Sequence, residues 1–392
     1  MTDSNRWLLP DGIEEVLPPL AWRAETLRRE LLDLYRSWGY ELVIPPYIEY
    51  LESLLTGIGS DLDIQTFKVT DQLTGRMMGI RADMTPQVAR IDAHSLRHEG
   101  PARFCYGGSV LHTRAANMLS SRSPIQMGAE LYGCADLTAD AEIISLMLET
   151  LDVAGAQQIH LDIGHVAIYR GLVAAAGLGG DEEAELFDLL QRKAKADVES
   201  FIKAKVSDPA VAEMLARLTI LNGAADVIDK ARAVLRQAPP SVQQALDMLE
   251  ELGQRLATMY PQIDLYFDLA ELRGYQYHTG IVFAAYVSGY GQAIAKGGRY
   301  DHIGEVFGRA RAATGFSADL KALIKLAPQP EPDKQAILAP LNSDSGLAAA
   351  IKQLRAAGER VIYRLPNDSN KEQLRCDREL VEQDGQWLVK PV

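Results

Sequence analysis

The chain has 392 residues, of which 47% are hydrophobic and 24% charged, a composition typical of a globular protein of two or three domains. A formal net charge of −13 gives no basic footprint for nucleic acid or an anionic membrane. The three cysteines are far apart and lack metal-ligand spacing, so we expect neither a disulfide framework nor a metal site. No signal peptide and no membrane-spanning apolar run is evident, which favours a cytoplasmic location.

The first fifty residues are expected to contain a long helix and an interrupted strand. Apolar side chains recur every three to four residues from Leu20 to Trp38, and Gly39 stands where such a helix would end. The next segment, YELVIPPYIEY, has the composition of a strand, but Pro45 and Pro46 cannot donate to a sheet ladder. We therefore expect it at a sheet edge or at an interface.

A hairpin and a short helix are predicted next. The hairpin comprises residues 67–70 and 77–81, with a turn around residues 73–75. The helix runs from Thr85 to His94, with Thr85 as the N-cap and Pro86 at the first helical position.

Two short strands joined by a polar loop are predicted from Phe104 to His112 and from Ile125 to Gly133. Strand side chains alternate with a period of two, so the second strand has two different faces. One face carries Gln126, Gly128 and Glu130, and the other carries Met127, Ala129 and Leu131. The first is suited to a ligand floor and the second to packing against helices. A sheet whose polar face simply meets water would give the same pattern.

The middle of the chain becomes almost purely helical. A helix from Asp140 to Leu151 precedes a strand that ends at Gly164. Residues 166–260 have helical spacing and no strand signal, so we predict a helical insertion. Two apolar stripes are expected in its core: Phe187, Leu190, Ala194, Val198 and Phe201 form one, and Val242, Ala245, Leu249, Leu252, Leu256 and Met259 form the other.

Strand character returns after the insertion and is followed by a second domain. The segments IDLYFDLA and GIVFAAYVSGYGQAIAKGGRYD are predicted strands. A proline-rich segment at residues 327–334 indicates a linker. We thus predict a first domain over residues 1–326 and a small α/β domain of strand–helix–strand order over residues 335–392.

Three segments resemble the catalytic core of histidyl-tRNA synthetases: RADMT from Arg81, RGYQYHTGIVF from Arg273 and KGGRYDHIGEVFG from Lys296. The hairpin at residues 104–133 is similar to the second signature motif of class II synthetases, and residues 39–45 resemble the first. The match covers about residues 5–325, apart from the insertion. The resemblance implies an α+β fold in which helices flank an antiparallel sheet of six or seven strands, with a dimer interface at the first motif.

The resemblance also implies a pocket for free L-histidine. Asp83 and Thr85 would hold its α-amino group, and Gln126 and Arg273 would face its carboxylate. The imidazole would lie among three further side chains, Glu130, Tyr277 and His278. Each pairing is chemically sensible, because an amine needs an acceptor, a carboxylate suits a guanidinium and an imidazole needs both donor and acceptor partners. Asp83 is one methylene shorter than the family's glutamate, and His278 replaces its second tyrosine.

The nucleotide-binding positions depart further from the family. His112 stands where the family has an arginine for the α-phosphate, and Asp319, Lys321 and Ala322 replace a glycine, a glutamate and an arginine. An imidazole is mostly neutral at pH 7 and cannot form a bidentate fork. Losing two charge-assisted contacts costs about 3–6 kcal/mol of nucleotide stabilisation. We therefore expect no adenylation, no catalytic residue and no cofactor.

A histidine pocket without nucleotide machinery resembles the regulatory subunits of ATP phosphoribosyltransferase. Residues 335–392 are too few for the synthetases' anticodon-reading domain, so we expect no tRNA partner. The resemblance implies a non-catalytic protein, required for the first step of histidine biosynthesis, that assembles with the short-form catalytic subunit. It also implies a homodimer within a larger hetero-oligomer and L-histidine as the feedback effector.

Two alternatives stay open. A divergent histidyl-tRNA synthetase or amino-acid ligase would catalyse histidine-dependent ATP–pyrophosphate exchange. A purely architectural dimer with a vestigial pocket would not bind histidine.

Some conspicuous residues have simpler explanations. Gly297 and Gly298 suit a close backbone approach or a turn better than a phosphate cradle, because no helix N-terminus follows in frame. Arg273 fits an idle surface cation poorly, since it is followed directly by Gly274 and Tyr275. Solvated positions are expected for His94, His98, His160 and His302.

Overall fold

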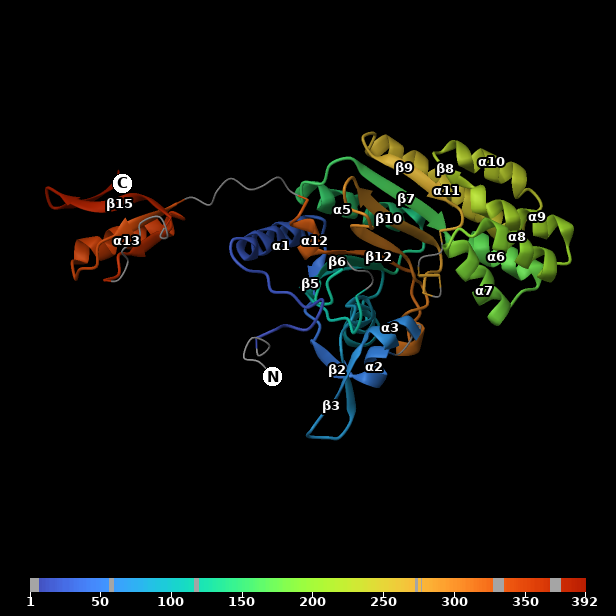
Figure 1. Ribbon diagram of the computed structural model, residues 1–392, viewed down its shortest axis with the longest axis horizontal. Coiled ribbons are helices and arrows are strands. Elements are labelled where there is room, and N and C mark those ends of the chain that lie inside the picture. The colour runs from blue at the N-terminus through green and yellow to red at the C-terminus, as the bar shows by residue number, and fades with distance from the viewer. Residues whose placement is uncertain are drawn as a thin grey trace. The chain divides into compact units, whose positions relative to one another are not determined.

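The computed structural model describes residues 7–55, 60–115, 120–271, 274–275, 277–326, 335–366 and 375–392. The chain divides into two compact units, residues 1–327 and 328–392 (Figure 1). The predicted linker at residues 327–334 lies outside the described residues.

The first unit is built on a nine-stranded sheet with the order β1-β5-β6-β12-β11-β10-β7-β9-β8. In that order the strands are Glu41–Leu42, Ala102–Ser109, Ile125–Tyr132, Ala313–Asp319, Ala295–Arg299, Ile281–Val287, Ile159–His165, Asp264–Asp268 and Asn222–Gly223. The six strands from β5 to β7 are antiparallel throughout. The edges differ from the predicted all-antiparallel sheet, because β1 pairs with β5 and β9 with β7 in parallel.

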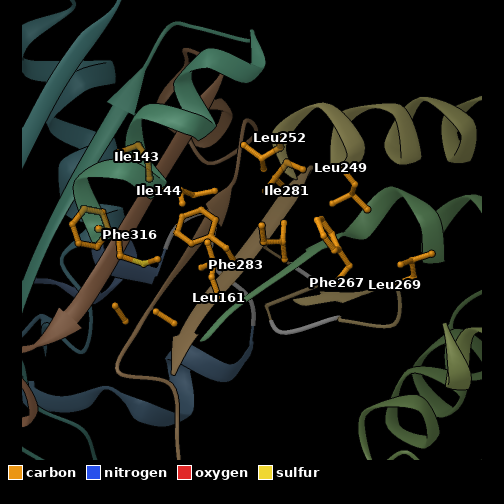
Figure 2. Close-up of a cluster of buried hydrophobic side chains, with 14 of the residues drawn as sticks. Ile143, Ile144, Leu161, Leu249, Leu252, Phe267, Leu269, Ile281, Phe283 and Phe316 are labelled. Atoms are coloured by element: carbon orange, nitrogen blue, oxygen red, sulfur yellow. The ribbon is translucent and has the colours of Figure 1, made fainter. Parts of the chain in front are cut away.

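Helices cover one face of this sheet, and the main hydrophobic core lies between these helices and the strands. α1 (Leu20–Ser37), α5 (Leu137–Val153) and the short α12 (Leu320–Leu323) pack against β5, β6 and β12. The predicted apolar face of β6, residues 127, 129 and 131, is buried against them, as expected. Phe283 and Phe316 extend from two strands toward Ile143 and Ile144 of α5 (Figure 2).

A small sheet with three strands lies beside the other face (Figure 1). Its order is β2 (Ile48–Tyr50), β4 (Met77–Ile80) and β3 (Phe67–Thr70), so the predicted hairpin is confirmed. Pro45 and Pro46 separate β1 from β2, which join different sheets as edge strands. Helices of this region are α2 (Leu51–Leu55), α3 (Ser60–Gln65), α4 (Thr85–Arg90) and a π-helix at Ile91–Leu96.

The predicted N-cap of α4 is wrong. Met84 occupies the cap position without a side-chain hydrogen bond, and Thr85 is the first helical residue. The Thr85 hydroxyl donates instead to the carboxyl of Glu130. A tertiary contact has therefore taken the group that local sequence assigned to capping.

The insertion is helical, with two departures from prediction. Its helices are α6 (Val166–Ala176), α7 (Asp181–Gln191), α8 (Lys195–Lys205), α9 (Pro209–Arg217), α10 (Asp226–Val234) and α11 (Pro240–Met259), and a 3₁₀ turn spans Leu218–Ile220. The second predicted stripe lies on α11 and is buried as expected, except for Met259 at the helix end, which is exposed. The first stripe is divided between α7 and α8. The chain breaks there because Lys193 adopts a left-handed backbone with φ of 51°. The insertion also contains β8, which the helical pattern did not predict.

The second unit has one more hairpin than predicted. Its elements are β13 (Ala336–Ala339), α13 (Ser345–Ala356), β14 (Val361–Tyr363), β15 (Cys376–Gln383) and β16 (Gln386–Pro391). They form a sheet of order β14-β13-β15-β16, against which α13 packs through Leu347 and Ile351. The turn between β15 and β16 is Asp384-Gly385, a strong hairpin signal that the strand–helix–strand prediction overlooked.

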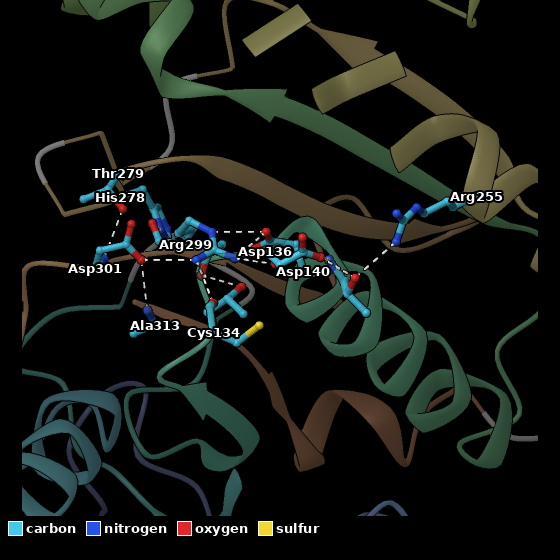
Figure 3. A network of polar contacts seen from close by, with 12 residues as sticks. Cys134, Asp136, Asp140, Arg255, His278, Thr279, Arg299, Asp301 and Ala313 are labelled. Carbon is cyan, nitrogen blue, oxygen red and sulfur yellow. Dashed lines mark hydrogen bonds and ion pairs between the residues drawn. The ribbon is translucent and has the colours of Figure 1, made fainter. Parts of the chain in front are cut away.

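A buried ion pair joins the end of β11 to α5 (Figure 3). The guanidinium of Arg299 lies 2.6 Å from the carboxylate of Asp140, and their side chains are 5% and 0% exposed. Two further donations from Arg299 reach the backbone carbonyls of Cys134 and Asp136. This network fixes the end of β11, and Tyr300, the residue that follows this strand, enters the site.

Replacing Asp140→Ala should lower the free energy of unfolding by about 3–5 kcal/mol, because it removes the nearer and fully buried counter-charge of Arg299 and leaves only Asp301, which is partly exposed and 3.3 Å away. Lys230→Ala is the matched control, since it breaks the exposed Lys230–Asp226 pair and should cost about 1 kcal/mol or less. Urea unfolding followed by circular dichroism measures both. Equal losses in the two variants would contradict the structural role assigned to the buried pair.

Candidate functional site

Glycines on the open face of the large sheet make room for buried polar side chains. Gly315 of β12 stands opposite Glu130 of β6, and a Cβ on it would overlap a carboxyl oxygen of Glu130. A Cβ on Gly128 would lie 2.5 Å from the hydroxyl of Tyr106. The prediction that Gly128 and Glu130 share the polar face of β6 is confirmed.

Glu130 is the centre of the site. It is 1% exposed and accepts hydrogen bonds from the hydroxyls of Tyr106 at 2.8 Å, Thr85 at 2.9 Å and Tyr300. Burial raises the pKa of Glu130 to about 8, although the three hydroxyls oppose the shift. The carboxyl is therefore largely protonated near pH 7.

An aromatic wall stands beside this carboxyl. Tyr277 stacks on Tyr300 with ring centroids 5.2 Å apart, and His278 meets Tyr277 edge-on at 5.2 Å. The hydroxyl of Tyr277 is buried and has no hydrogen-bond partner within the described part of the chain. A free donor thus lies near Glu130.

His278 is held as a neutral imidazole. Burial lowers its pKa to about 4. Nδ1 lies 3.2 Å from the carbonyl oxygen of Arg299, an acceptor only, so Nδ1 carries the proton and Nε2 is left as an acceptor. The buried network of Arg299 therefore positions His278 as well (Figure 3).

Asp83 and Gln126 form a second polar group. The Gln126 amide donates to Asp83 Oδ1 at 2.8 Å and accepts from the backbone N–H of Met84 at 3.0 Å. The backbone N–H of Thr85 also donates to Asp83 Oδ1, at 3.0 Å. The amide predicted to meet a ligand carboxylate is thus paired with the carboxylate predicted to hold an amine.

These residues line two neighbouring cavities. The inner cavity, of about 350 Å³, is bordered by Asp83, Thr85, Glu130, Tyr277 and His278. The outer cavity, of about 670 Å³, is bordered by Gln126 and again by Asp83. The structure therefore brings six of the predicted ligand residues together, and the seventh, Arg273, lies outside the described residues.

Several site residues were missed by the sequence prediction. Tyr106 and Tyr300 donate to Glu130, and Glu271 and Lys296 line the inner cavity. Tyr300 belongs to the quoted GGRYD segment, whose tyrosine was the available signal. Tyr106 faces the site only because β5 pairs with β6 in the observed register.

The positions expected at the nucleotide border the outer cavity. Ala322 is buried in the apolar core, and the polar groups of the other three are engaged within the protein. His112 Nε2 lies 2.9 Å from the carbonyl oxygen of Ala82. Asp319 accepts from the backbone N–H groups of Ile125 and Lys321, each at 3.0 Å. The Lys321 ammonium donates to Ser123 Oγ and to the carbonyl oxygen of Glu14.

Gly297 and the four histidines predicted to be solvated have the structural roles expected of them. A Cβ on Gly297 would overlap the carbonyl oxygen of Gly315, so it permits a close backbone approach. The four histidines expected to be solvated, at positions 94, 98, 160 and 302, are exposed. Across the described ranges, no cluster of His, Cys, Asp and Glu suits a metal ion, and no helix has the length and apolarity to cross a bilayer.

Comparison with known proteins identifies the family of both units of the chain. Residues 12–323 match the histidyl-tRNA synthetase family, and residues 334–390 match the C-terminal domain of ATP phosphoribosyltransferase subunit HisZ. The crystal structure of an ATP phosphoribosyltransferase regulatory subunit/histidyl-tRNA synthetase from Bacillus halodurans C has a TM-score of 0.81 and 27% identity, covering 94% of this chain and 96% of that one. A chain of the Thermotoga maritima ATP phosphoribosyl transferase (HisG:HisZ) complex shares the fold, with a TM-score of 0.59, 17% identity and coverage of 75% and 96%.

The fold is therefore that of a histidyl-tRNA synthetase-like protein. The ATP phosphoribosyltransferase regulatory subunit of Thioalkalivibrio sulfidiphilus is 57% identical over 392 residues, which is 99% of each chain. The chain belongs to the family of ATP phosphoribosyltransferase regulatory subunits.

The buried carboxyl should make stability depend on pH. A folded-state pKa near 8, above the ordinary 4.5, stabilises the fold fully below about pH 4.5, and this contribution is lost as pH rises through about 8. Replacing Glu130→Gln removes the titration, so between pH 5 and 9 the wild-type chain should lose on the order of 3–5 kcal/mol more than the variant. Denaturant unfolding across this range measures the difference.

Glu213→Gln, at an exposed carboxyl, is the control and should follow the wild-type profile. Parallel profiles for wild type and Glu130→Gln would show that Glu130 ionises as an ordinary carboxyl.

Proposed function

We propose that this chain regulates ATP phosphoribosyltransferase without catalysing a reaction of its own, and that it senses L-histidine in the inner cavity. The observation that carries the proposal is the buried Glu130 carboxyl, set among hydroxyls and aromatic rings in a cavity of about 350 Å³. A carboxyl that titrates near neutrality is a suitable partner for an imidazole, which titrates in the same range.

The surrounding groups suit the rest of the ligand. The unpaired Tyr277 hydroxyl and the accepting Nε2 of His278 can complete the hydrogen bonds of the imidazole. Asp83 borders both cavities. It can therefore bind the α-amino group of a histidine whose imidazole lies in the inner cavity. The family resemblance adds Gln126 and Arg273 for the carboxylate.

The outer cavity supports a non-catalytic role. Among the described residues that border it there is no arginine. Of the three lysines among these described residues, Lys321 is already engaged by Ser123 and Glu14, and Lys296 and Lys325 offer single ammonium charges in place of a bidentate guanidinium. Asp319 would place a negative charge near a triphosphate. These contacts disfavour the alternative of a divergent synthetase or amino-acid ligase, which must bind ATP there.

We propose the short-form catalytic subunit as the partner, as the family resemblance implies. A catalytic partner is supported by the Thermotoga maritima chain of the same fold, which belongs to a HisG:HisZ complex. A homodimer is supported by the exposed apolar side chains of Leu42 and Ile44, which belong to the first motif. Three free thiols agree with an assembly in the reducing cytoplasm. Histidine would inhibit by binding one arrangement of the complex more tightly than another.

Co-purification with the short catalytic subunit tests the proposal. Phosphoribosyltransferase activity should require the complex and should fall when L-histidine is added. Full activity of the catalytic subunit alone would remove the regulatory role, and activity that histidine leaves unchanged would remove feedback sensing.

The histidine response should depend on Glu130. Glu130→Ala removes the imidazole's partner and should weaken histidine binding by about tenfold or more, the effect of losing a charge-assisted hydrogen bond, while size-exclusion chromatography shows the complex intact. Calorimetry on the full chain measures binding, with Glu213→Ala as the exposed-carboxyl control. Unchanged histidine affinity in Glu130→Ala would mean that the ligand binds elsewhere, for example on the partner.

A further inference from the structure

The inner cavity is lined by more acid than base. Asp83, Glu130 and Glu271 border it, and Lys296 is the one lysine or arginine among its described lining residues. An amino acid brings a negative carboxylate as well as a positive amine. Asp83 is the acid assigned to the amine, since Glu130 is largely protonated and assigned to the imidazole. Within the described ranges, Lys296 is the one cation that the cavity offers to the carboxylate.

Lys296 lies where that carboxylate would emerge. It is on β11, opposite Ser317 of β12, and both residues border the inner and the outer cavity. Asp83 also borders both cavities. An imidazole at Glu130 would leave the α-carbon of the ligand at this junction, with one carboxylate and one ammonium of the protein beside it.

The ammonium of Lys296 is not used by the fold. It forms no hydrogen bond or ion pair with the part of the chain that the structure describes, and its side chain is exposed to the cavities. Its charge acts inside the pocket, since it adds to burial in lowering the pKa of His278. By contrast, the amide of Gln126 is already paired with Asp83.

We propose that Lys296 binds the α-carboxylate of the amino acid in the inner cavity and selects the complete zwitterion over amines that lack a carboxylate. The proposal rests on the histidine pocket proposed above and adds Lys296 to Gln126 and Arg273, to which the family resemblance assigns the same carboxylate. Asp83 and Lys296 then form a pair of opposite charges that matches the two charges of the ligand backbone.

Calorimetry with L-histidine and L-histidinol tests this selection, because histidinol keeps the imidazole and the amine but has a hydroxymethyl group in place of the carboxylate. The full chain is used alone and in complex with the catalytic subunit. The wild-type chain should prefer histidine by about tenfold or more, and Lys296→Ala should reduce that preference to about threefold or less. Lys296→Arg should retain most of it, and Lys203→Ala, on α8, should leave it unchanged.

The failures of the two proposals are distinguishable. A Lys296→Ala variant that keeps the wild-type preference, or that loses affinity for both ligands equally, overturns the role of Lys296 and leaves the histidine pocket standing. A wild-type chain that binds neither ligand, alone or in the complex, overturns both. Thermal unfolding of each variant confirms that the compared chains are folded.

Discussion

The burial of the Glu130 carboxyl group determines which residues must surround it in the pocket. Removing such a group from water is costly unless its oxygens are hydrogen-bonded. Three hydroxyls from three separate segments supply those bonds, and the glycine opposite leaves the space. β5, β6, β12 and the GGRY segment must therefore be assembled together before the site exists. The same burial keeps the carboxyl protonated near neutrality, which suits it to a ligand that can exchange a proton with it.

The two faces of the sheet have different roles: one packs against helices and stabilises the fold, and the other lines the cavities. Apolar side chains of β6 face α1 and α5, whereas Gln126 and Glu130 face the cavities. The buried Arg299–Asp140 pair connects the two functions, because its strand end also positions His278 and Tyr300. Breaking this pair would leave a buried guanidinium with only the partly exposed Asp301 as counter-charge, so this strand end is expected to be rigid. A rigid strand end allows a small ligand to be bound by side chains that are already in position.

Local periodicity predicted the central architecture well. The period of two placed Glu130 and Met127 on opposite faces of β6, and the helical period defined α1 and α11. It failed where long-range contacts decide the outcome. Thr85 bonds to Glu130 instead of capping its helix, and Tyr106 reaches the carboxyl through strand pairing that no local pattern shows. The break at Lys193 and the Asp384-Gly385 hairpin are local features that an apolar stripe does not report. The assignment of individual side chains to parts of histidine stays a prediction.

The account depends on a proposed contrast between a cavity that binds an amino acid and a neighbouring cavity that does not bind ATP. Histidine-dependent ATP–pyrophosphate exchange by the purified chain measures that contrast most directly. We predict exchange no faster than that of a control reaction without the chain, at histidine concentrations that saturate its binding. Exchange at the rate of a histidyl-tRNA synthetase would show that the outer cavity binds and activates ATP, and would contradict the account.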